Sequence, residues 1–236
     1  MKNQIIKKAV TLIAMGVTII TIQTPAQAQL GGLLKKKGAD NSGGGGIDKN
    51  TFGKSAEKAV DDLLAARIAF LEAKAKMMDA IGVKADSVTK ASEALRAKEG
   101  STSDKVKRLE TVSKQTEGSD KEFVAKMAES KDLSADSKLK FTEGAAKFIE
   151  GVILEKDQIE NIQKLVEQGQ SLVQSASPLE KAGIVTMVKP VTTMATIVPG
   201  DVKEGASTLS KIFAFAKSQK VTIPGADKAT DKLGGL

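Results

Sequence analysis

The most regular pattern in the chain is a seven-residue repeat of apolar side chains between Ser134 and Ser177. Apolar residues recur in alternating steps of three and four, which is the spacing of one face of an α-helix. The repeat consists of Phe141, Ala145, Phe148, Val152, Ile159, Ile162, Val166, Val173 and Ala176, and Glu155 and Gly169 interrupt it. We therefore predict a helix of about 40 residues, or about 60 Å, that must bury this face against other helices.

The apolar face of this long helix is wider than the seam of a two-stranded coiled coil. Ile149 widens its first half, and Leu165 and Leu172 widen its second half. Because the widening changes flank, we expect two neighbouring helices rather than one continuous partner. The expected neighbours are the helix at 52–81 and the apolar helix after residue 178. If the long helix also binds another protein, Ile149, Leu165 and Leu172 are the predicted contact surface.

Two glycines of the long helix, Gly144 and Gly151, lie seven residues apart on one flank. Glycine has no side chain, so these positions allow another backbone to come close. Each glycine also weakens the helix by about 1 kcal/mol relative to alanine. We therefore expect close packing at this flank, with a bend in the helix as a possible consequence.

Shorter repeats predict the other helices. A helix at 52–81 ends at Gly82, and a weaker one covers 86–98. Ser103 is the expected N-cap of the next helix, in which 116–119 predicts a kink or break. Ser177-Pro178-Leu179-Glu180 is a strong helix start, with Pro190 inside the helix that follows. A turn at 199–201 then leads to a last helix at 202–217. Residues 221–224 read as extended, and the end of the chain as frayed.

The first 28 residues have the pattern of a secretory signal peptide. Three lysines precede an apolar stretch at 9–22, which is short for a membrane span. Ala26 and Ala28 then provide the small residues that a signal peptidase accepts, so we expect cleavage before Gln29. An uncleaved anchor is the alternative. A lipoprotein is excluded because the chain has no cysteine, and the expected location is the bacterial periplasm or the outside of the cell.

Residues 29–51 predict a flexible, glycine-rich linker between the signal peptide and the helices. Four consecutive glycines at 43–46 cannot hold an ordered backbone cheaply. The lysine run at 35–37 could contact anionic lipid, but each lysine contributes only about 1 kcal/mol near such a surface. A solvated tether is therefore the preferred interpretation.

The composition excludes several functions. The chain contains no histidine, cysteine, tryptophan or tyrosine, so the usual zinc, copper, haem and Ser-His or Cys-His sites cannot form. Ser-x-x-Lys occurs at 55–58, 87–90 and 137–140, a frequency expected by chance, without the motifs that accompany it in serine enzymes. The formal charge of +7 includes three signal-peptide lysines and is not a nucleic-acid footprint. We predict no catalytic residue, no metal and no cofactor.

The most hydrophobic stretch after the signal peptide is 184–198, and it has two interpretations. It is either a buried helix of a bundle, which we prefer, or a membrane-inserting segment like those of helical pore-forming toxins, which the chain resembles in general layout alone. About 15 residues is short for a span. The candidate membrane residues are Ile184, Val185, Val188, Val191, Met194, Ile197 and Val198.

The sequence therefore predicts an all-α protein: an elongated bundle of five or six helices at 52–220, with a tail at 221–236. We expect a non-enzymatic structural or protein-interaction role, with an unknown protein partner or self-association and no nucleic acid. A membrane- or lipid-active protein that uses 184–198 is the alternative.

Overall fold

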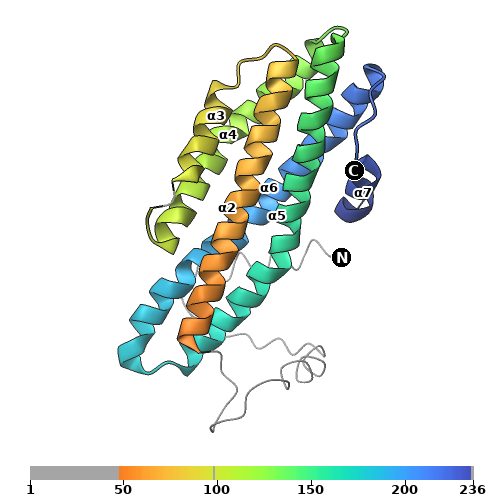
Figure 1. Ribbon diagram of the computed structural model, residues 1–236. Coiled ribbons are helices and arrows are strands. Elements are labelled where there is room, and N and C mark those ends of the chain that lie inside the picture. Colours follow the sequence, from red (N-terminus) through yellow and green to blue (C-terminus); the bar gives the residue numbers. More distant parts are fainter. Residues whose placement is uncertain (1–47, 98, 235–236) are drawn as a thin grey trace. The chain divides into compact units, whose positions relative to one another are not determined.

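The computed structural model describes residues 48–97 and 99–234, and it confirms the all-α class (Figure 1). The predicted signal peptide and most of the linker predicted at 29–51, with its lysine run, lie outside the described residues, and 49–51 belong to the first described helix. The described residues contain no strand. Their helices are α2 (Lys49–Ala80), α3 (Asp86–Arg96), α4 (Thr102–Glu129), α5 (Ala135–Ser175), α6 (Pro178–Ser218) and α7 (Ala226–Leu233).

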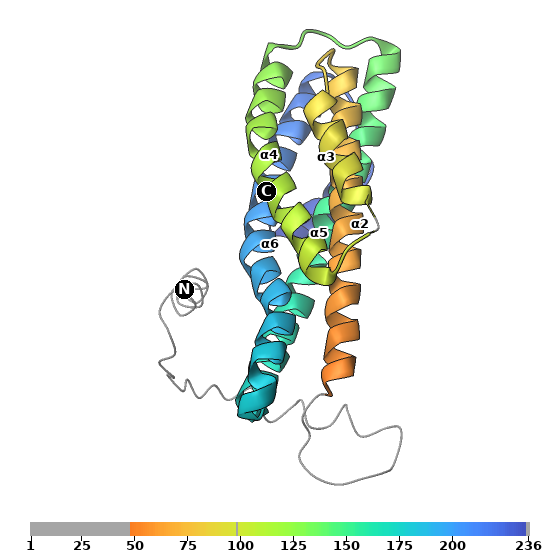
Figure 2. The same cartoon turned by 90° about the vertical axis from the view of Figure 1, so that its left-hand side faces the viewer.

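Successive helices of the described residues alternate in direction along the chain (Figures 1 and 2). The main neighbours of α5 are α2 and α6. The short α3 packs on α2 and α4, α4 also lies against α6, and α7 packs on α5. Figure 2 shows that the N-terminal half of α6 extends beyond α3 and α4, where α2 and α5 accompany it. The prediction that α5 packs against the first helix and the helix after Pro178 is confirmed.

Most helix starts are set by local hydrogen bonds that the sequence encodes. The side chains of Asp48 and Ser134 accept from backbone N–H groups in the first turns of α2 and α5, which satisfies donors that a helix N-terminus leaves free. The backbone N–H of Ser177 donates to Glu180 Oε2 at 3.4 Å at the start of α6. The cap of α4 is Ser101, not the predicted Ser103. Its hydroxyl accepts from Asp104 N at 3.3 Å, and its own N–H donates to Asp104 Oδ2 at 3.0 Å.

α4 has no break at 116–119, because the helix is continuous there. The hydroxyl of Thr116 donates to Val112 O at 2.9 Å, and that of Ser119 donates to Thr116 O at 2.7 Å. Both side chains are buried. Polar residues that would favour a break in water are therefore held inside the helix by hydrogen bonds to its own backbone.

The predicted turn at 199–201 is wrong, since α6 runs without interruption through Pro190 and Pro199. An internal proline removes a backbone hydrogen bond and costs about 3 kcal/mol. The burial of Val191, Met194 and Val198, which lie between the two prolines, offsets this cost. After the second proline, Asp201 is held by Ser113, whose hydroxyl donates to Asp201 Oδ2 at 2.9 Å.

The end of the chain is more ordered than predicted, because 226–233 forms α7 instead of a frayed tail. Gly225 and Gly234 adopt positive φ angles of 82° and 83° at its two ends, a conformation that glycine reaches without strain. Ala229 is fully buried, and Lys232 Nζ lies 3.0 Å from Asp157 Oδ2 of α5. An eight-residue helix is marginal alone, so contacts with α5 hold it.

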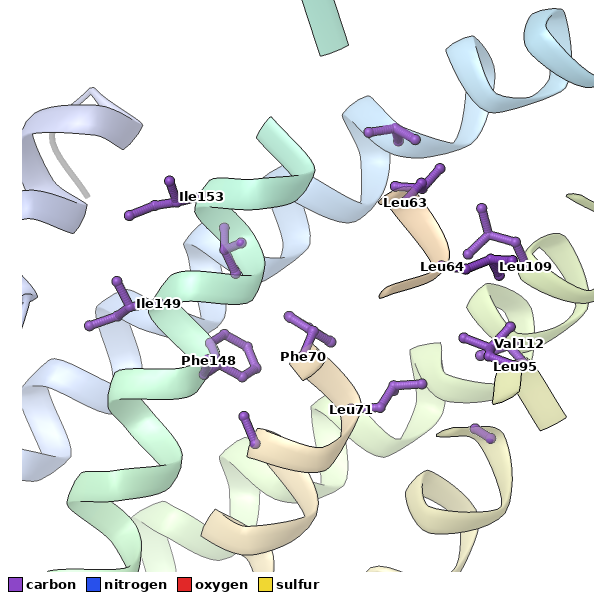
Figure 3. Packing of buried hydrophobic residues seen from close by; sticks show 14 of the residues in the cluster. Leu63, Leu64, Phe70, Leu71, Leu95, Leu109, Val112, Phe148, Ile149 and Ile153 are labelled. Atoms are coloured by element: carbon purple, nitrogen blue, oxygen red, sulfur yellow. The ribbon is translucent and has the colours of Figure 1, made fainter. Parts of the chain in front are cut away.

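The core between α2 and α5 depends on close backbone approach. The Phe70 and Phe148 rings face each other with centroids 4.3 Å apart (Figure 3). A Cβ at Gly151 would lie 3.1 Å from Phe70 Cα, and one at Gly144 would lie 3.0 Å from Ala73 O. Those distances are shorter than ordinary contacts, so only glycine fits without a shift. The predicted close packing at Gly144 and Gly151 is confirmed.

Candidate functional site

A layer of buried charge crosses the middle of the bundle. It starts from two cations on one face of α2, Arg67 and Lys74, which are seven residues apart and 3 % and 0 % exposed. Such side chains are rarely buried unless they are paired. Their partners come from α4, α5 and α6, so the layer connects the four long helices. We call these side chains the charged layer: Arg67, Lys74, Ser113, Ser119, Asp120, Glu155, Asp201 and Glu204.

Arg67 joins three helices in this layer. Its Nη1 lies 3.6 Å from Glu155 Oε1 of α5, and its Nη2 lies 3.5 Å from Asp201 Oδ1 of α6. The same Nη2 donates to Ser113 Oγ of α4 at 3.4 Å. The guanidinium carbon also lies 4.9 Å from the centroid of the Phe70 ring, close enough for a cation–π attraction. The two carboxylates raise the pKa of Arg67 against the effect of burial, so the side chain stays charged.

Glu155 is the most completely buried carboxyl group of the layer. It is 1 % exposed, and neither carboxyl oxygen accepts a hydrogen bond from a described residue. Burial raises the pKa of Glu155 to about 7, because the attraction of Arg67 only partly offsets desolvation and Asp201 adds repulsion. Burial likewise raises the pKa of Asp201. Glu155, which interrupts the apolar repeat of α5, therefore holds a proton far above the pH at which an exposed glutamate releases it.

Lys74 makes the second set of contacts in the layer. Its Nζ lies 2.6 Å from Asp120 Oδ1 and donates to Ser119 Oγ at 2.7 Å. Burial lowers the pKa of Lys74, and Asp120 opposes that shift. Glu204 lies within hydrogen-bonding reach of Asp120, and burial followed by repulsion from Asp120 raises its pKa. This end of the layer therefore holds one ammonium group against two carboxyl groups.

The inner part of the charged layer is closed to substrates, because the Arg67 and Glu155 side chains are 4 % and 1 % exposed. Within residues 48–97 and 99–234 no group of three or more acidic, histidine or cysteine side chains could hold a metal ion. The charged layer instead links the four long helices, and a slip of one helix along another would leave buried charges without their partners. The sequence contained a signal for it: Arg67 and Lys74 occupy helical spacing with Leu63, Phe70 and Met77, all of them buried.

The three residues predicted as a partner surface are buried in this chain. Ile149, Leu165 and Leu172 are 2 %, 6 % and 7 % exposed. Ile149 lies on the side of α5 that faces α7 (Figure 3), and α7 is a helix that the sequence analysis did not anticipate. The wide face of α5 is therefore covered by helices of its own chain, and these residues are not available to an external partner.

The candidate membrane residues divide between two faces of α6. Ile184, Val188, Val191, Met194 and Val198 are buried against the rest of the bundle, whereas Val185 is 48 % exposed and Ile197 is half-buried. A helix with one buried face is what the preferred interpretation of 184–198, a bundle helix, requires.

The outer face of the N-terminal half of α6 has little charge. We define the α6 stripe as the side chains that share this face: Leu179, Ala182, Val185, Thr186, Lys189, Thr193 and Thr196. Leu179 is 96 % exposed, more than any other large apolar residue of the described chain. Residues 163–200 contain 5 charged side chains among 38, against 28 % for the whole chain. This end of the bundle is thus the weakly charged end.

Comparisons with known proteins add no relative: no family model matches the chain, and no curated protein or solved structure is significantly similar to it.

Proposed function

We propose that this chain is an exported, non-enzymatic helical-bundle protein that binds another protein through the α6 stripe. The export step rests on the signal-peptide pattern of 1–28, with cleavage between Ala28 and Gln29. The protein-binding step rests on one observation: a fully exposed leucine, Leu179, at the head of a weakly charged helix face. The partner is either a second copy of this chain or another exported protein.

The chemistry of the α6 stripe supports a protein partner. Exposed apolar groups that gather in one place commonly mark an interaction site, and the centres of protein interfaces are depleted of charge. In the stripe, Leu179 and Val185 supply apolar area, the threonines supply neutral polar groups, and Lys189 is the single charge. The opposite face of the same helix makes the core contacts of the bundle.

A photo-crosslinking amino acid at position 179, introduced into the full chain in a diderm bacterium, tests this proposal. We expect ultraviolet light to produce a discrete adduct, which Val185→Lys weakens. Its mass distinguishes a second copy from another protein. The matched control carries the crosslinker at Leu139, an exposed leucine near the N-terminus of α5, at the opposite end of that helix from Leu179. Equal labelling at both positions, or no adduct at Leu179, would overturn the assignment, and a mature chain that does not start at Gln29 would overturn the export step.

A membrane-active role is the second candidate, and one observation favours it: α6 is long and apolar enough to cross a bilayer, although core helices of soluble proteins pass the same test. Insertion would first have to separate Ile184, Val191 and Met194 from the bundle, at about 1.5–3 kcal/mol for each side chain. Dye release from anionic vesicles at low salt tests this role. Release that disappears with Val191→Asp would support it, and intact vesicles would exclude it.

A further inference from the structure

The charged layer reaches solvent in a groove between α4 and α6. The groove has a volume of about 530 Å³, which lies within the range of small-ligand sites. Val124 and Ala125 line the α4 side, and Gly200 and Ser207 line the α6 side. It belongs to the C-terminal half of α6 and is therefore separate from the α6 stripe.

The charges of this groove are sorted by depth. Its deep part contains two carboxyl groups: Asp120, which is 7 % exposed, and Glu204, which is half-buried beside it. Its outer part is formed by three exposed lysines, Lys121, Lys203 and Lys211. A ligand that complements these charges must therefore carry a positive group at its inner end and a negative group at its outer end.

The two carboxyl groups in the groove outnumber the one buried cation that contacts them, Lys74. The charged layer contains four carboxyl groups, Glu155, Asp201, Asp120 and Glu204, and two cations, Arg67 and Lys74. Lys74 approaches the Asp120 carboxylate from inside the bundle, whereas the Asp120–Glu204 pair borders the groove. A buried carboxylate such as Asp120 beside a second carboxyl group is stabilised when a further cation or a proton joins the pair.

A third polar group is available at the same place. Thr208 is 3 % exposed and lines the groove. Its hydroxyl oxygen can accept a hydrogen bond as well as donate one. Asp120, Glu204 and Thr208 together offer three oxygen acceptors, and a primary ammonium group has three donors.

We propose that this groove binds a small zwitterion, an amino acid or short peptide. Its ammonium group lies among Asp120, Glu204 and Thr208, and its carboxylate lies toward Lys203 and Lys211. A free divalent metal fits less well, because Lys74 already occupies one side of Asp120 and three lysines surround the opening. The proposal does not depend on the α6 stripe or on export.

Titration of the purified protein with four probes tests the proposal: glycylglycine, glycine, ethylamine and acetate, followed by NMR or calorimetry. We expect saturable binding of glycylglycine and glycine, weaker binding of ethylamine, which has only the ammonium group, and none of acetate. Glu204→Gln should lower the glycylglycine affinity at least about tenfold, or about 1.4 kcal/mol. Glu93→Gln, an exposed carboxylate on α3, is the matched control and should leave the affinity unchanged.

The double variant Lys203→Gln, Lys211→Gln keeps the proposal testable if Glu204→Gln does not fold, because both lysines are exposed. It should weaken glycylglycine but not ethylamine. Absence of binding for every probe would overturn the site. Equal binding of ethylamine and glycylglycine would overturn the zwitterion, and a Glu93→Gln effect equal to that of Glu204→Gln would place the ligand elsewhere.

Discussion

The charged layer makes the stability of this protein depend on pH in a way that Glu155 should dominate. In the folded state the pKa of Glu155 is raised from 4.5 to about 7 by burial. Between these values the native protein holds a proton that the unfolded chain releases. The free energy of unfolding must therefore fall as the pH rises from 4.5 to about 7. At 1.36 kcal/mol for each pH unit, the loss is about 3 kcal/mol.

The variant Glu155→Gln isolates this contribution. Glutamine has nearly the shape of a protonated glutamate and does not titrate, so the variant should lose about 3 kcal/mol less than the wild type over this pH interval. Asp201, whose pKa is also raised by burial, titrates in both proteins and largely cancels in the difference. Arg67 keeps its charge in both and retains Asp201 as a partner.

Urea unfolding at several pH values between about 4.5 and 8 measures the effect. Glu160→Gln, an exposed residue of the same helix, is the matched control and should follow the wild-type curve. Parallel curves for wild type and Glu155→Gln would refute the reasoning, since they would mean that Glu155 releases its proton at the same pH in the folded and unfolded chains.

Three further predictions concern packing, charge and capping, each measured as the urea-unfolding free energy. Gly151→Ala should destabilise the protein by about 1–3 kcal/mol, because its methyl group would meet the Phe70 backbone. The control Gly118→Ala, where nothing lies within 4 Å of the added Cβ, should stabilise it by up to about 1 kcal/mol. Equal effects of the two substitutions would contradict the close approach at Gly151. Lys74→Ala should cost about 3 kcal/mol or more, because it leaves Asp120 buried without its partner. The control Lys58→Ala removes one side of an exposed pair with Asp62 and should cost less than about 1 kcal/mol. Similar costs for the two substitutions would contradict a buried Lys74–Asp120 pair. Ser134→Ala should cost about 1 kcal/mol, and no change would show that its hydroxyl does not cap α5.

Several parts of the fold could be predicted because local chemistry encodes them. The apolar repeat and the N-cap Ser134 locate α5 to within two residues, and Ser177-Pro178 locates the start of α6. Spacing alone also predicted that Gly144 and Gly151 allow a close neighbour, since residues seven apart share a helix flank. These features depend on residues a few positions apart, and a single sequence contains them all.

Other features depended on contacts between distant residues, and the sequence misled where such contacts outweigh local preference. Pro199-Gly200-Asp201 reads as a turn, yet Ser113 and Arg67 hold Asp201 within α6. Ile149 reads as a partner surface, yet it lies on the side of α5 that α7 covers (Figure 3).

The sequence by itself determined the apolar repeat that had to be buried, where most helices begin, and that the usual sites built on histidine or cysteine cannot form. The tertiary structure decided which buried residues face one another. Glu155 illustrates the difference, because the sequence shows a carboxylate in an apolar repeat but not the cation beside it. Arg67 is far from Glu155 along the chain, and only the packing of α2 on α5 brings the two within 3.6 Å. Periodicity reports the direction of a side chain on its own helix, whereas its partner depends on the fold.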